Sequence, residues 1–139
     1  MVPCGAVLYA AMRFARAWLP VIIWSVVILS ASTDTFSSNE SRGWLASLIG
    51  PALASALNIV FRKLGHVIGY GILGILARRA DRRVLLAFGI ALLVAITDET
   101  RQSMTLLRTG SPWDVLLDGL SAWLGILVMT RAGMWRERA

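Results

Sequence analysis

Long stretches without charged residues constrain this chain more than any other feature. A helix needs about 20 mostly apolar residues to cross about 30 Å of hydrocarbon. Four such stretches occur, and we predict transmembrane helices at about 14–33, 60–79, 84–100 and 112–131. The composition agrees, because 57% of the residues are hydrophobic and 16% are charged, whereas a soluble domain is about half apolar and a quarter charged. We predict one all-α, polytopic membrane domain covering residues 1–139.

The charge-free part of the first stretch, Ala17 to Thr33, shares some features with a secretory signal, since Arg13 and Arg16 precede it. It exceeds the core of about 7–15 residues that signal peptides have, and further spans follow, so we interpret it as an uncleaved span. Trp44 to Gly50 is expected to lie along the outer interface. The segment 52–61 either continues the second helix or bends along the interface. The single cysteine, Cys4, cannot form a disulfide within the chain.

The positions of the basic residues predict the orientation. Of the 14 basic residues, nine fall in segments on the same side of the membrane as the N-terminus, and five fall in segments on the other side. Because cytoplasmic loops are enriched in Arg and Lys, we predict that both termini are cytoplasmic. The same positions explain the net charge of +6 without nucleic acid, so we expect no nucleic-acid partner and expect membrane lipids as partners.

Polar side chains gather at the outer ends of the last three spans. Helical spacing puts each set on one face, and the three faces are expected to share one outer-leaflet pocket. The second span contributes Lys63, His66 and Tyr70; the third contributes Asp98, Glu99 and Gln102; the fourth contributes Asp114 and Asp118; and the preceding loop contributes Arg108.

Carboxylates at membrane depth need nearby cations. Inserting one at the centre of a span costs roughly 2.5–3.5 kcal/mol. The candidate cations are Lys63, His66, Arg101 and Arg108. Simpler structural roles exist for some of the polar groups. Lys63 fits an interfacial anchor, and Ser111, Pro112 and Asp114 fit a helix start with a capping box. The carboxylate of Asp118 is the hardest to explain structurally.

The chemistry open to these residues is limited. His66 and the four carboxylates offer nitrogen and oxygen ligands. However, paired histidines and cysteines are missing, so we assign neither a metal nor a cofactor. The serines lack the strand–turn–helix setting of an esterase nucleophile. General acid–base chemistry by His66 with Asp98 or Glu99 is feasible, and these three are the catalytic candidates if the protein is an enzyme.

Three blocks of the sequence together resemble the VanZ-like family. The first is Lys63-x-x-His66-x-x-x-Tyr70, the second is Asp98-Glu99-x-x-Gln102, and the third is an Arg-containing loop that leads to Asp114. The blocks occur in the same order and at matching spacing, and the resemblance covers roughly 61–129. The segment through Asn58 matches only as a generic first span and outer loop.

The resemblance implies a small, multi-pass protein of the bacterial inner membrane. The member that gives the family its name is associated with resistance to the glycopeptide teicoplanin. Asp118 departs from the family pattern, which usually has asparagine there. The resemblance implies that the family's motif positions in this chain are Lys63, His66, Tyr70, Asp98, Glu99, Gln102, Arg108 and Asp114.

Three functions compete. The first is binding of an amphiphile, either a lipid-linked cell-wall precursor or a lipoglycopeptide, with Lys63, His66 and Arg108 holding an anionic head group. The second is an enzyme that acts on a lipid-linked phosphate or acyl group. The third, a proton-coupled carrier, ranks last because the ionisable residues stop near Asp118. The sequence does not define the oligomeric state.

Overall fold

Four long α-helices make up nearly all of the described chain. The computed structural model describes residues 4–32, 43, 46–104 and 111–133. Its helices are α1 (Cys4–Ala31), α3 (Pro51–Ala80), α4 (Val84–Ser103) and α5 (Pro112–Arg131). Within these residues there is no strand, and residues 46–49 form a short helical turn before α3. The prediction of an all-α protein is confirmed.

Three of the described helices are long and apolar enough to cross a membrane, namely Gly5–Ala31, Pro51–Ala80 and Pro112–Arg131. Helix α4 has 20 residues but carries Asp98, Glu99 and Arg101 close together near its C-terminal end. Any 18 consecutive residues of α4 include all three charges, whereas each of the other three helices has an apolar segment of that length with at most two. Composition and length therefore support three of the four predicted spans.

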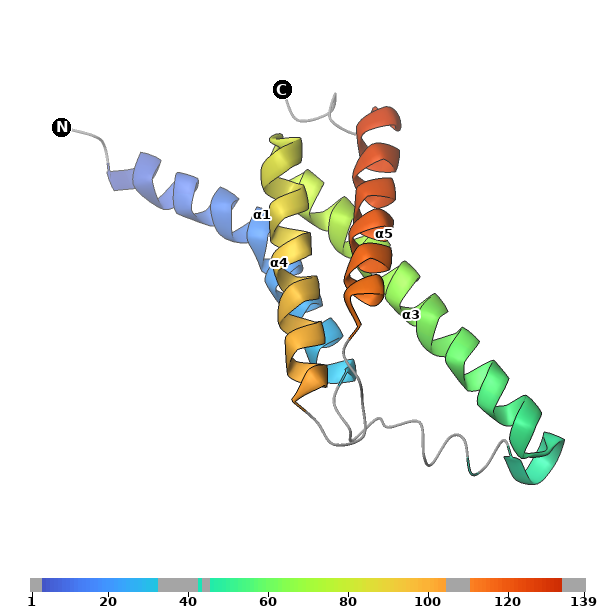
Figure 1. The fold of residues 1–139 in the computed structure, drawn as a ribbon. Coiled ribbons are helices and arrows are strands. Elements are labelled where there is room, and N and C mark those ends of the chain that lie inside the picture. The colour runs from blue at the N-terminus through green and yellow to red at the C-terminus, as the bar shows by residue number, and fades with distance from the viewer. Residues whose placement is uncertain (1–3, 33–42, 44–45, 105–110, 134–139) are drawn as a thin grey trace.

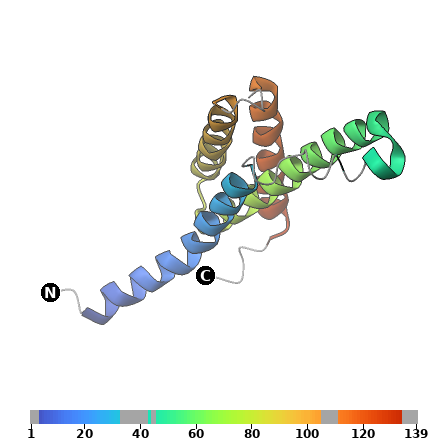
Figure 2. The ribbon, with the colours of Figure 1, turned by 90° about the horizontal axis from the view of Figure 1, so that it is seen from below.

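Helices α3, α4 and α5 pack against one another, and α1 packs mainly against α3. Figure 1 shows α4 and α5 side by side, with α3 crossing them obliquely and extending beyond the bundle at its N-terminal end. The view from below in Figure 2 shows α1 on the face of α3 that is remote from α5. The C-terminal ends of α1 and α4 and the N-terminal end of α5 lie at the same end of the bundle (Figure 1).

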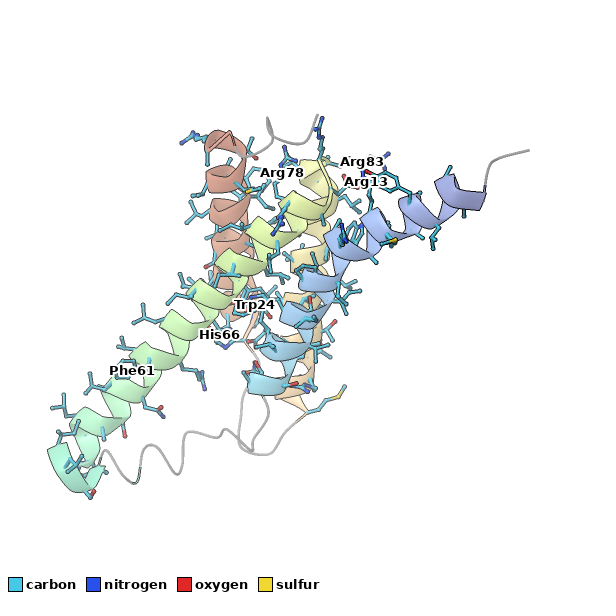
Figure 3. All side chains as sticks on the ribbon, turned by 180° about the vertical axis from the view of Figure 1, so that it is seen from behind. Arg13, Trp24, Phe61, His66, Arg78 and Arg83 are labelled. Atoms are coloured by element: carbon cyan, nitrogen blue, oxygen red, sulfur yellow. The ribbon has the colours of Figure 1, made fainter. Side chains whose placement is uncertain are left out.

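Helix α3 runs without interruption from Pro51 to Ala80. The residues between 52 and 61, for which the sequence left two options, continue the helix. It therefore begins well before residue 60, where the second span was predicted to start. Pro51 occupies the first turn, where its missing N–H has no helical partner to lose. In this first half large apolar side chains such as Phe61 are exposed and lie away from the other helices (Figure 3).

Glycines allow α3 and α5 to cross with their backbones in contact. A Cβ atom added to Gly74 would lie 2.1 Å from the carbonyl oxygen of Ala122, and one added to Gly125 would lie 2.1 Å from that of Gly71. No side chain fits at either position. Small residues at such crossings are the usual basis of helix packing within membranes.

The buried face of α4 is lined with alanines. Ala87, Ala91 and Ala95 recur every four residues and are fully buried, and the same face continues into Asp98. The large buried side chains beside these alanines come from α3 and α5, among them Leu73 and Ile126. The inner face of α4 is thus apolar over most of its length and polar at its C-terminal end.

Helix α1 is held on α3 by a side-chain hydrogen bond and by apolar contacts. The indole Nε1 of Trp24 donates to the carbonyl oxygen of Gly69 at 2.9 Å. Val21 and Ile28 are buried in the same apolar cluster as Tyr70. The C-terminal half of α1 therefore fixes one wall of the region that contains the polar groups.

Candidate functional site

The predicted polar side chains from α3, α4 and α5 gather at one end of the bundle. This is the end where α1 and α4 finish and α5 begins (Figure 1). Figure 3 shows His66 and Trp24 where α3 and α1 lie side by side. Buried polar residues at this end are Asp98, Glu99, Gln102, Asp118 and Ser121.

Lys63 and Asp114 form an ion pair at the rim of this cluster. Nζ of Lys63 lies 3.0 Å from Oδ1 of Asp114, and the lysine side chain is 52% exposed. An exposed pair of this kind contributes little stability, roughly 0–1 kcal/mol. Its main consequence is that the charge of Lys63 is already compensated by a carboxylate of α5.

His66 and Asp118 form a more deeply placed pair. Nδ1 of His66 lies 3.1 Å and 3.2 Å from the two carboxylate oxygens of Asp118, and the Asp118 side chain is 0% exposed. Since an ionised carboxylate can only accept, this contact favours the tautomer with the hydrogen on Nδ1. The His66 ring also stacks on Tyr70, with the ring centroids 6.0 Å apart. The imidazole is therefore oriented by two neighbours.

Asp98 connects α4 with the end of α1. Its Oδ2 accepts hydrogen bonds from Ser32 Oγ at 2.8 Å and from Gln102 Nε2 at 3.0 Å. Arg101 lies with Nη2 3.9 Å from Oδ1 of Asp98, and it also donates to the carbonyl oxygen of Leu29 near the C-terminus of α1. The negative end of the α1 helix dipole lies here, and it interacts favourably with the positive charge of the Arg101 guanidinium.

The start of α5 differs from the predicted capping box. Ser111 is the N-cap, and its side chain accepts from the backbone N–H of Trp113, as predicted. Asp114, which was expected to complete the box, is paired with Lys63 instead. The backbone N–H of Ser111 donates to Oε2 of Glu99 at 2.8 Å. In a capping box the side chain three residues after the N-cap accepts the N-cap N–H hydrogen bond, and here Glu99 of α4 accepts it instead.

Several buried polar atoms in this region have no hydrogen-bond partner among the described residues. They are Oδ1 of Asp98, Oε1 of Glu99 and the hydroxyl of Tyr70. Such atoms are uncommon in folded proteins, and they often mark a site that binds a further molecule or ion. In addition, His66, Glu99 and Asp118 each place one potential ligand atom within 4.8 Å of the other two.

A cavity of about 300 Å³ lies between α1 and α3 beside this cluster. Most of its wall is apolar and comes from Trp24 and Ile28 of α1 and from the glycines of α3. Ser32, Arg62, His66 and Tyr70 contribute polar groups to the wall. His66 therefore belongs both to the carboxylate cluster and to the cavity.

The structure brings together all of the predicted site residues that it describes. Lys63, His66 and Tyr70 lie on α3, Asp98, Glu99 and Gln102 on α4, and Asp114 and Asp118 on α5. Tyr70 is 1% exposed, so it lies inside the bundle, and it also lines the cavity. Arg108 lies outside the described residues.

Sequence reasoning missed the contribution of α1. Trp24, Ser32 and Arg62 were not among the candidates, yet all three line the cavity. The one available signal for Arg62 was its place next to Lys63. Nothing in the sequence shows which face of α1 meets α3.

Comparison with known proteins gives one match. The family model described as VanZ/LLP1 matches residues 17–133. This range includes α3, α4, α5 and most of α1, and so all the helices that surround the site. No curated protein and no solved structure is significantly similar to the chain.

Proposed function

The chain belongs to the VanZ/LLP1 family, and from this premise we propose that it is an envelope protein of the bacterial inner membrane that binds an amphiphilic molecule in its outer leaflet. The observation that carries this proposal is the cavity between α1 and α3. It combines an apolar wall with charged and polar groups at one end, as a binding site for an amphiphile requires.

The proposal assumes four spans with both termini in the cytoplasm. Helix α4 lies beside α5 within the bundle. This position supports counting α4 as one of the four spans despite its charges. Those charges sit at the same end as the polar cluster, and there Arg101 lies 3.9 Å from Asp98. Helix α3 is about 45 Å long at 1.5 Å per residue, so it is long enough to cross the hydrocarbon and continue into the outer interface.

Arg62 is the cation best suited to an anionic head group. Lys63 pairs with Asp114 and His66 pairs with Asp118, so neither offers an uncompensated charge. Arg62 is exposed and lines the cavity. A guanidinium binds phosphate or carboxylate through two parallel hydrogen bonds. We therefore assign head-group binding to Arg62, and acyl-chain binding to the wall formed by Trp24 and Ile28.

Photo-crosslinking of the purified protein with a diazirine-labelled lipid-linked cell-wall precursor tests this proposal. Gly65 lines the cavity, and a Cβ there would meet no atom within 4 Å, so Gly65→Leu is the variant chosen to fill the cavity. We expect at least a tenfold loss of crosslinking. Gly89→Leu is the matched control, because Gly89 is equally open but lies on α4 away from the cavity. Equal labelling of the two variants contradicts the proposal.

The charge requirement has its own matched pair. Arg62→Ala is expected to reduce labelling by the anionic probe about tenfold, which corresponds to one charge-assisted contact. Arg79→Ala removes an exposed arginine from the opposite end of α3 and is expected to leave labelling unchanged. In bacteria, expression of the protein is expected to raise teicoplanin resistance, and Arg62→Ala but not Arg79→Ala should abolish the increase.

An enzymatic role is the alternative, and the pairing of His66 with Asp118 favours it. A buried carboxylate that fixes an imidazole at the wall of a cavity is the arrangement of a general base. The substrate would be a lipid-linked phosphate or acyl ester. Turnover of such a lipid by purified protein, lost in His66→Ala, would support this role; absence of turnover across a broad lipid panel argues for binding alone.

A further inference from the structure

Three potential metal ligands from three different helices meet beneath the rim of the bundle. His66 comes from α3, Glu99 from α4 and Asp118 from α5. One ligand atom of each lies within 4.8 Å of the other two. His66 is partly buried, Glu99 is 5% exposed and Asp118 is fully buried. Three elements distant in sequence thus present nitrogen and oxygen donors to one small volume.

The spacing suits one cation. Ligand atoms that lie about 2.1 Å from a common ion are about 3.0 to 4.2 Å apart, depending on the angle between them. The contact of 3.1 Å between His66 Nδ1 and Asp118 Oδ1 already falls in this range. A small side-chain movement brings the Glu99 oxygen into it. A cation would then replace the hydrogen between His66 and Asp118, because metal ligation requires deprotonated donors.

The charges in this volume also favour a cation. Oε1 of Glu99 is buried and has no hydrogen-bond partner among the described residues. The neighbouring Asp98 is also buried, but its charge is compensated by Arg101, whose Nη2 lies 3.9 Å from Oδ1. Arg101 also donates a hydrogen bond to the carbonyl oxygen of Leu29. Lys63 forms an ion pair with Asp114. A buried carboxylate that lacks a paired charge, as Glu99 does among the described residues, is expected to coordinate a metal or another cation.

We propose that His66, Glu99 and Asp118 bind a first-row divalent cation such as Zn²⁺ or Mn²⁺. One imidazole with two carboxylates suits these ions better than Mg²⁺, which prefers an all-oxygen shell. Three protein ligands leave at least one coordination position for water or another molecule. The proposal goes beyond binding of an amphiphile and does not depend on it.

Titration of the chelator-treated, full-length protein with Zn²⁺ and Mn²⁺ in lipid nanodiscs tests the site. We expect one ion per chain by elemental analysis and a rise in Tm with metal concentration, as mass action requires. With Mn²⁺, pulsed electron paramagnetic resonance should detect coupling to one ¹⁴N nucleus, from His66. An absence of binding, or a bound ion without nitrogen coupling, would overturn the proposal.

Conservative variants show which residues bind the ion. Asp118→Asn keeps the shape and a hydrogen-bonding oxygen but removes the charge, and Glu99→Gln does the same on α4. Each is expected to weaken metal affinity at least tenfold. The matched control is Asp81→Asn, which changes a carboxylate at the opposite end of α3 and should leave affinity unchanged. Affinity that survives both site variants also overturns the proposal.

One comparison separates this site from the amphiphile cavity. Glu99 is a proposed metal ligand that does not line the cavity, so Glu99→Gln should weaken metal affinity and leave crosslinking intact. Arg62 lines the cavity but is not a proposed ligand, so Arg62→Ala should reduce crosslinking and leave metal affinity intact. Failure of one proposal can therefore be recognised without reference to the other.

Discussion

Gly74 of α3 and Ala122 of α5 meet backbone to backbone, so closely that a Cβ on Gly74 would lie 2.1 Å from the Ala122 carbonyl oxygen. This crossing sets how α3 and α5 approach each other. It thereby also sets the separation of the groups farther along the same helices, including His66 and Asp118, whose side chains are in contact at 3.1 Å. The geometry of the candidate site depends on a contact that contains no polar side chain.

Gly74→Ala is expected to lower the free energy of unfolding by about 2 kcal/mol or more, because the backbone of α5 must move to admit the methyl group. Gly89→Ala is the matched control. Gly89 lies on an exposed part of α4 where a Cβ meets nothing within 4 Å, and alanine favours the helix there. Unfolding in detergent measures both variants. Equal stability of the two would show that the α3–α5 crossing tolerates a wider separation.

Asp98→Ala and Lys63→Ala should differ strongly in stability. The first removes a buried acceptor that Ser32 and Gln102 share, and we expect a loss of about 2–4 kcal/mol. The second removes one partner of an exposed ion pair, and we expect less than about 1 kcal/mol. The measurement is the unfolding midpoint of each variant in the same detergent. A larger effect of Lys63→Ala would contradict the assignment of Asp98 as the link between α1 and α4.

Trp24→Phe removes the hydrogen bond to the Gly69 carbonyl while keeping an aromatic ring in place. We expect a loss of about 1 kcal/mol, the usual contribution of a single hydrogen bond. Trp113→Phe serves as the control because Trp113 is 77% exposed, and changes at exposed positions usually stay within about 0.5 kcal/mol. Thermal unfolding in detergent compares the two, and a larger loss for Trp113→Phe would argue against this anchor of α1.

Reporter fusions test the orientation. Green fluorescent protein fluoresces when fused in the cytoplasm, and alkaline phosphatase is active outside it. Fusions after Asp81 and after Arg131 are expected to give fluorescence, and fusions after Ser103 should give phosphatase activity. The physical reason is the excess of arginine beside the first two positions. Phosphatase activity at Asp81 would reverse the orientation and move the site to the cytoplasmic side.

Much of the helical content follows from local patterns. Apolar runs of sufficient length predict helices in a membrane because every backbone N–H and C=O must be satisfied within the segment. The start of α5 at Ser111 and Pro112 was likewise predicted from local capping chemistry. The continuation of α3 through residues 52–61 was not predictable, since the same residues suit an interfacial bend.

For the site, the sequence by itself determined which side chains share a face on each helix, because helical periodicity acts within a few residues. It placed Lys63, His66 and Tyr70 on one stripe of α3, and Asp118 on a stripe of α5. Only the tertiary structure decided the partners. Glu99 accepts from Ser111, Asp114 pairs with Lys63, and α1 completes a cavity with Arg62. These contacts depend on how closely whole helices approach and at what angle, which is fixed by packing between residues far apart in the chain.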